Sequence, residues 1–242
     1  PDQALSDVHG IIHLMGENLG NGRWTAQRKR EIYDSRIIST RKLVAAAPAG
    51  LQCFVCASAI GIYPGEGDSW YDESYVIPNN CHFLQTICRD WEQEAAMIER
   101  KGIRRVSIRT GVVLGKDGGM LGKLLPLFRM GLGGSIGDGR QWLPWIHLDD
   151  IVSIWHNAAC NTRYSGPVNA VAPNPVRYLE FAQTLGEVLR RPTWLTTPAA
   201  VLRLVLGEAA ALGLNSYRIS PQKLMETYDF SFKFDTLSAA LK

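Results

Sequence analysis

The sequence of 242 residues has little net charge, few cysteines and no long uninterrupted apolar run. A formal net charge of +3 without a basic stripe excludes nucleic acid as an expected partner. Five cysteines, an odd number, disfavour a disulfide framework and favour a reducing compartment, either the cytoplasm or another such as an organelle matrix. The first residues are polar, which predicts no signal peptide.

The most apolar window, residues 198–214, is interrupted by Arg203 and Glu208. It is too short and too charged to span a bilayer, so we expect no membrane partner. We interpret this window instead as a well-buried helix.

Two sequence patterns have the residue types of a ligand site but lack the local structure that such a site needs. Cys53 and Cys56 lie three residues apart in a strand-like run. Side chains alternate along a strand, so these two thiols point to opposite faces and no metal site is predicted. The glycines of residues 131–137 have the spacing of a dinucleotide-binding turn, but no strand precedes them and no helix follows.

Buried apolar runs alternate with helical patterns in the first half of the chain. The expected strands cover residues 8–16, 51–60 and 104–114, and the expected helices cover residues 25–47 and 82–100. Strand–helix alternation of this kind predicts the α/β class, a Rossmann-like doubly wound parallel sheet. Glycine-rich turns and short elements follow residue 115, with helices expected at 175–189, 201–212 and 221–225, and they predict a small C-terminal α/β lobe.

Four segments share their order and spacing with a known family. They are HLMGEN at 13–18, RTGVVLGKDGGMLG at 109–122, GRQWLPWIHLDD at 139–150 and GPVNAVAPNPV at 166–176. Together they resemble the back half of an extended short-chain dehydrogenase/reductase, of the atypical branch called epimerase family proteins.

The resemblance implies a division of the chain. Residues 1–115 would be the remainder of an NAD(P)-binding Rossmann domain whose first βαβ unit is missing. Residues 116–242 would be a mixed segment that contributes late sheet strands and the C-terminal substrate lobe. On this interpretation the chain is a fragment, and it binds cofactor weakly or not at all because the phosphate-binding turn lies upstream.

The resemblance also implies the ligand contacts. NADP is the expected cofactor, with NAD possible, and the second ligand is a small-molecule substrate. The implied cofactor-binding residues are Leu14, Gly16, Glu17, Arg36, Ala57, Ser58, Arg109, Thr110 and Gly111. Arg109 could equally clamp a buried acidic neighbour. Arg140 and Gln141 lie in a loop that reaches the substrate or the adenine in related enzymes.

The usual catalytic pair of the superfamily, a tyrosine four residues before a lysine, is absent. None of the eight lysines has tyrosine at that position, and the helix over residues 82–100 offers Phe83, Leu84 and Arg89 instead. Ser58 matches the serine at the end of its strand that hydrogen-bonds a substrate carbonyl or alcohol. Tyr63 is the nearest phenol in the sequence and is a candidate proton donor.

Two functions remain open. The first is an NAD(P)-dependent oxidoreductase or epimerase-like protein acting on an unknown small molecule. The alternative is a catalytically inactive NADP(H)-binding sensor or scaffold, which the missing pair favours. The sequence gives no oligomeric state. In the block at 145–150, Asp149 or Asp150 is expected to cap a helix and His147 to be a hydrogen-bonded core histidine.

Overall fold

The computed structural model describes residue 5 and residues 7–242. Its centre is a four-stranded parallel sheet in the order β1-β2-β4-β9. The strands are β1 (Gly10–His13), β2 (Cys53–Ala59), β4 (Arg104–Thr110) and β9 (Gly166–Ala170). The three expected strands of the first half therefore lie side by side and parallel, as predicted.

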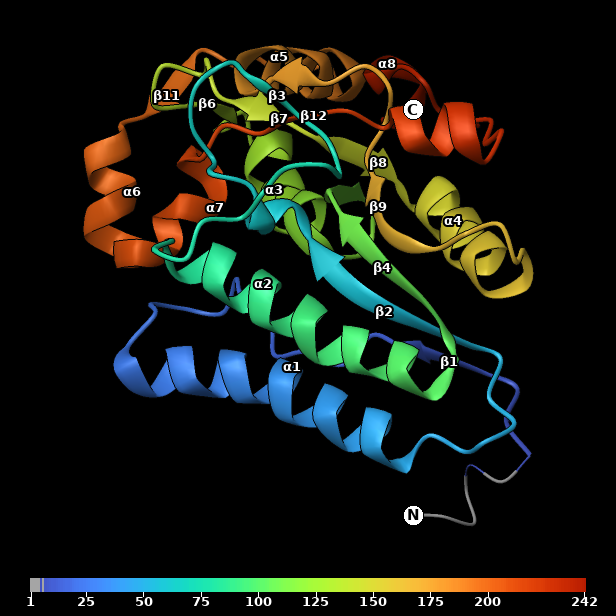
Figure 1. Cartoon of the computed structure of the whole chain (residues 1–242). Coiled ribbons are helices and arrows are strands. Elements are labelled where there is room, and N and C mark those ends of the chain that lie inside the picture. The colour runs from blue at the N-terminus through green and yellow to red at the C-terminus, as the bar shows by residue number, and fades with distance from the viewer. Residues whose placement is uncertain (1–4, 6) are drawn as a thin grey trace.

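Helices cover both faces of this sheet (Figure 1). One face carries α1 (Ala26–Ala46) and α2 (Phe83–Ala96), which pack apolar residues such as Ile37 and Trp91 against Phe54 of β2. The opposite face carries α4 (Leu148–Cys160), where Ile154 packs against Val55 and Val106. The doubly wound α/β arrangement is thus confirmed.

The helix boundaries follow local chemistry. The Thr25 side chain accepts a hydrogen bond from the Arg28 backbone and caps α1, close to the predicted start. His82 caps α2 in the same way through Nδ1, and the helix tightens into a 3₁₀ turn at Met97–Lys101. The cysteine prediction also holds: Cys53 Sγ faces the Ala159 carbonyl of α4, whereas Cys56 packs on the opposite side.

The smaller lobe gathers at the carboxyl ends of the sheet strands (Figure 1). Its strands pair two by two: β5 (Val112–Leu114) with β8 (Trp145–His147), β7 (Trp142–Leu143) with β10 (Val176–Arg177), β6 (Gly134–Ile136) with β11 (Leu195–Thr197), and β3 (Trp70–Tyr71) with β12 (Arg218–Ile219). Its helices are α3 (Gly119–Arg129), α5 (Tyr178–Leu189), α6 (Ala199–Leu206), α7 (Ala211–Leu214) and α8 (Leu237–Ala240). Residues 70–71 join the lobe although they precede residue 115 in the chain.

Several boundaries differ from the sequence predictions. The strand expected over 104–114 breaks at Gly111 into β4 and β5. The helix expected at 175 begins at Tyr178, because Val176 and Arg177 pair with β7. The short helix expected at 221–225 is a π-helical turn over Lys223–Thr227.

The apolar window at 198–214 is not a buried helix. Gly207, with φ of +60°, ends α6, and a 3₁₀ turn at Gly207–Ala210 leads into α7. Leu204 is 76% exposed and Val205 is 59% exposed. The sequence prediction was therefore wrong about burial. Within the described residues no helix is both long enough and apolar enough to cross a membrane.

The block at 145–150 begins a helix as expected, but the residue that caps this helix is not the one expected. His147, not an aspartate, caps α4: its Nδ1 accepts from the Asp149 backbone at 3.1 Å. Its ring is half-buried and packs on Phe234. The buried Asp150 carboxylate instead accepts from the backbone of Lys233 and Phe234, and so holds the C-terminal segment on the helix.

Candidate functional site

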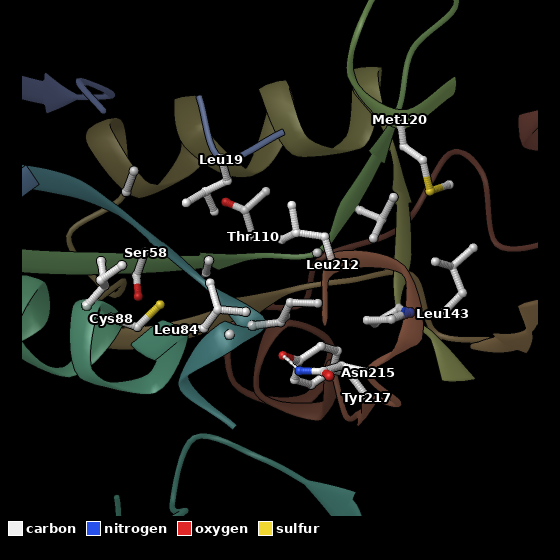
Figure 2. A pocket seen from close by; sticks show the side chains of 18 of the residues that line it. Leu19, Ser58, Leu84, Cys88, Thr110, Met120, Leu143, Leu212, Asn215 and Tyr217 are labelled. Atoms are coloured by element: carbon white, nitrogen blue, oxygen red, sulfur yellow. Dashed lines mark hydrogen bonds between the residues drawn. The ribbon is translucent and has the colours of Figure 1, made fainter. Parts of the chain in front are cut away.

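A cavity of about 390 Å³ opens where the carboxyl ends of β1, β2 and β4 meet the lobe. In doubly wound sheets this edge is the usual ligand-binding position. The sheet side supplies Leu14, Ala57, Ser58 and Thr110, and α2 supplies Leu84, Ile87, Cys88 and Trp91. The lobe closes the other side with Met120, Leu143, Leu212, Asn215 and Tyr217 (Figure 2).

The structure brings together most of the residues predicted from the sequence. Those that line the cavity are Leu14, Gly16, Arg36, Ala57, Ser58, Thr110, Gly111 and Gln141. Glu17, Tyr63, Arg109 and Arg140 do not line it. The predicted contacts therefore separate into a group at the cavity surface and a group that lies behind or beside it.

Ser58 belongs to a buried polar network. Its hydroxyl donates to Glu92 Oε1 at 2.6 Å. Arg109 holds the same carboxylate from the other side, with Nε 2.9 Å from Oε1 and Nη2 3.0 Å from Oε2. The two charged side chains are only 4% and 12% exposed. Arg109 is thus the internal clamp of an acidic neighbour, and it reaches the cavity only through Glu92 and Ser58.

Tyr63 lies deeper in the same network. Arg109 Nη1 donates to its hydroxyl at 2.9 Å, and that hydroxyl donates to Asn169 Oδ1 at 2.7 Å. Burial raises the pKa of Tyr63 above its ordinary value of 10.0. Because the phenol is fully buried and does not line the cavity, it is not placed to donate a proton to a ligand there.

The first strand ends in a loop braced by two arginines. Arg36 donates to the Glu17 carbonyl from Nη2 and to the Ile32 carbonyl from Nη1, both at 3.0 Å, and stacks over Trp91. A Cβ on Gly16 would lie 2.9 Å from the Arg36 guanidinium, so glycine lets the loop rest on this side chain. Glu17 itself pairs with Arg28 at 2.8 Å, on the surface.

Of the two residues predicted to contact the substrate, Arg140 and Gln141, only Gln141 lines the cavity. Arg140 is exposed, and its backbone N–H donates to Asp138 Oδ1 at 3.0 Å. Gln141 lines the cavity, and its Nε2 donates to the carbonyls of Ile136 and Gly213 at 3.2 and 3.0 Å. Both amide hydrogens are therefore used, and the Gln141 side-chain carbonyl is left to accept from a ligand.

Leu84 and Cys88 of α2, four residues apart, both line the cavity. Burial raises the pKa of Cys88 to about 12, so its thiol is protonated at neutral pH and is no base. The sequence missed Glu92, Asn215 and Tyr217. Glu92 is bonded by Ser58 and Arg109, which lie 34 and 17 residues away, and Asn215 and Tyr217 reach the cavity from the lobe. The sequence signal for Glu92 was its spacing on α2: it lies four residues beyond Cys88 and therefore on the same face of the helix.

Comparison with known proteins places this geometry in a family. The sequence model of the NAD dependent epimerase/dehydratase family matches residues 2–169, and that of a domain of unknown function matches residues 197–242. The chloroplastic epimerase family protein SDR39U1 homolog of Arabidopsis thaliana is 39% identical over 96% of this chain and 67% of its own length. The epimerase family protein YfhF of Bacillus subtilis is 37% identical, over 100% and 79% respectively.

Two solved structures share the fold and a substantial part of the sequence. Human epimerase family protein SDR39U1 (isoform 2), crystallised with NADPH, superposes with a TM-score of 0.93 at 34% identity, over 98% of this chain and 82% of that one. A nucleoside-diphosphate sugar epimerase from Corynebacterium glutamicum gives a TM-score of 0.79 at 32% identity, over 100% and 47%.

Proposed function

The chain belongs to the NAD dependent epimerase/dehydratase family, and on that premise we propose that it is an NADP(H)-dependent oxidoreductase or epimerase-like enzyme acting on a small molecule. The observation that carries the proposal is the cavity at the strand ends, with the Ser58 hydroxyl in its wall. NADP rather than NAD is proposed because the human relative was crystallised with NADPH.

The described residues fit the nicotinamide end of such a cofactor. Ala57, Ser58, Thr110 and Gly111 form a wall of small side chains at the ends of β2 and β4. A Cβ at Gly111 would lie 2.4 Å from the Pro144 carbonyl, so the close approach of backbone segments there requires glycine. A nicotinamide bound against this wall would exchange a hydride with the substrate.

Ser58 is the group through which the protein would handle the substrate oxygen. Its hydrogen lies toward Glu92, so its oxygen lone pairs are available to the cavity. In this arrangement a substrate alcohol donates its hydrogen to Ser58 Oγ. A substrate carbonyl is polarised only if the Ser58 hydrogen turns from Glu92 toward the cavity.

The test is NADPH binding followed by turnover, measured on the complete gene product and on residues 1–242. We expect the complete product to bind NADPH, by fluorescence titration, and to oxidise it with a member of a panel of aldehydes, ketones and nucleotide sugars. Residues 1–242 alone should bind weakly, because no turn between a described strand and the helix that follows it has the GxGxxG spacing of a dinucleotide-binding loop.

The Ser58→Ala variant should lower turnover by about 10²-fold, the scale of a lost proton-handling group. Ser153→Ala on the exposed face of α4 is the matched control and should change nothing. Tight NADPH binding without turnover by any substrate, unchanged in Ser58→Ala, would instead favour an inactive sensor or scaffold.

A further inference from the structure

The lobe side of the cavity carries no charge. Its side chains include the apolar Met120, Trp142, Leu143 and Leu212, together with polar but neutral groups. Among the described residues that line the cavity, only Arg36 is charged, and it lies on the sheet side with its guanidinium bonded to two backbone carbonyls. A diphosphate buried here would lose its hydration without gaining a cation partner.

Two lobe arginines contact Trp142 of the cavity wall without lining the cavity themselves. Arg177 and Arg218 stack on Trp142, with guanidinium carbons 3.9 and 4.5 Å from its ring centroids, but neither lines the cavity. Arg177 is paired with the Asp68 carboxylate at 2.9 Å. Because neither guanidinium lines the cavity, neither offers its charge to a ligand there.

The Tyr217 side chain, from the lobe, is placed to donate a hydrogen bond into the cavity. The Tyr217 hydroxyl accepts from Asn215 Nδ2 at 2.9 Å (Figure 2), and Asn215 is held by its backbone bond to the Ala211 carbonyl at 3.0 Å. Within the described residues the Tyr217 hydrogen has no acceptor. Burial raises the pKa of Tyr217 to about 12, so this phenol keeps its hydrogen at neutral pH.

We propose that the lobe side of the cavity takes an uncharged, largely apolar carbonyl compound or the corresponding alcohol, and that the Tyr217 hydroxyl donates to its oxygen. A nucleotide sugar is excluded as the substrate. The inference rests on the proposed function, since it assigns the substrate class of the same cavity. Tyr217 thereby supplies from the lobe a phenol of the kind that α2 lacks.

The experiment measures equilibrium binding by calorimetry on the complete gene product, so that it does not depend on turnover. The probes are acetophenone, cyclohexanone and decanal as neutral carbonyls, ethylbenzene as the hydrocarbon analogue of acetophenone, and UDP-glucose as a nucleotide sugar. We expect at least one neutral carbonyl to bind and UDP-glucose not to bind. Binding of UDP-glucose, or of no neutral carbonyl at millimolar concentration, overturns the proposal.

Tyr217→Phe keeps the ring and removes the hydroxyl. It should weaken carbonyl binding about three- to tenfold, the range expected for one hydrogen bond, and leave ethylbenzene binding unchanged. Tyr164→Phe is the matched control, because Tyr164 is a buried tyrosine, 1% exposed, that does not line the cavity. Unchanged carbonyl binding in Tyr217→Phe, or an equal loss in Tyr164→Phe, would show that the assignment to Tyr217 is wrong.

A second pair of variants tests the apolar wall without touching the phenol. Leu212→Arg places a cation in the cavity wall and should lower the affinity for neutral carbonyls at least tenfold, whereas Leu204→Arg on the exposed face of α6 should not. Equal affinity for neutral carbonyls in Leu212→Arg and Leu204→Arg would overturn the proposal.

The substrate class and the proposed function can fail separately. NADPH oxidation by a nucleotide sugar would leave the proposed function standing and overturn this inference. Binding of a neutral carbonyl without binding of NADPH would overturn the proposed function and leave the substrate class of the cavity standing.

Discussion

The ion pair between Arg109 and Glu92 is the most deeply buried charge pair that contacts the cavity wall. Removing one partner leaves the other charge buried without compensation, which costs about 3–5 kcal/mol in proteins. We therefore expect Arg109→Leu to lower the free energy of unfolding by that amount, measured by urea denaturation. Glu92→Gln should be milder, because the amide oxygen can still accept from Arg109 and Ser58.

The control for this prediction is a more exposed ion pair that joins α1 to α2. Arg41 and Glu94 form an ion pair in which the arginine is 63% exposed. Arg41→Leu should change stability by less than about 1 kcal/mol. If Arg109→Leu is equally mild, the buried pair does not hold α2 on the sheet and its assigned role fails.

His13 gives the protein a measurable response to acid. Its Nε2 lies 2.8 Å from the Thr40 hydroxyl, which donates to the Arg36 carbonyl, so Nε2 carries the hydrogen. Its Nδ1 has no partner among the described residues. Burial lowers the pKa of His13 from 6.5 to about 4. The neutral ring is therefore the form that the folded protein holds at neutral pH.

The sign of the effect follows from these two pKa values. Between pH 6.5 and 4 the unfolded chain binds a proton at His13 and the folded protein does not, so the free energy of unfolding falls as the pH falls. His13→Gln should flatten this dependence, measured by urea denaturation at several pH values. An imidazole that titrates near 6.5 in the folded protein, by NMR, would contradict the prediction.

At the scale of elements, the junction between β4 and β5 determines the shape of the cavity. A Cβ on Gly111 would approach the Pro144 carbonyl to 2.4 Å and Val171 to 2.9 Å. Gly111→Ala must push the segment before β8 outward, which we expect to destabilise the fold by about 1–3 kcal/mol and to weaken ligand binding. Gly118→Ala, with nothing within 4 Å of the added carbon, should be neutral in both calorimetry and denaturation.

The sheet was predictable at this scale because its signal is local. Continuous apolar runs mark strands that are buried on both faces, and β2 begins with one. The break at Gly111 was not predictable, because it depends on Pro144 and Val171, which reach it only in the folded chain. The burial of residues 198–214 was predicted wrongly, since apolar composition alone does not say whether a helix has a neighbour to pack against.

The cavity residues that were predictable also differ from the others in having a local sequence signal. Ser58 and Thr110 were predictable because each ends a strand or lies beside a glycine turn, where the chain order itself gives the position. Tyr63 and Arg109 were assigned to the ligand by position, but both turn inward. Arg109 bonds the Glu92 carboxylate, which no motif marked, and the Tyr63 hydroxyl bonds Arg109. Tyr217 reaches the cavity from the residue before β12, more than a hundred residues after Ser58, so no local pattern could indicate it.

At the scale of the whole molecule, β1 is an edge strand that pairs with β2 alone among the described strands. Ile12, Leu14 and Met15 beside this edge are 48%, 63% and 50% exposed. Unpaired backbone flanked by apolar side chains promotes edge-to-edge association, which a lysine opposes.

We therefore expect residues 1–242 to self-associate with rising concentration in sedimentation velocity, and Ile12→Lys to shift them toward the monomer. Leu204→Lys, on the exposed face of α6, removes apolar surface away from any strand edge and should have no effect. The opposite result would place the association surface on α6 and leave the β1 edge without that role.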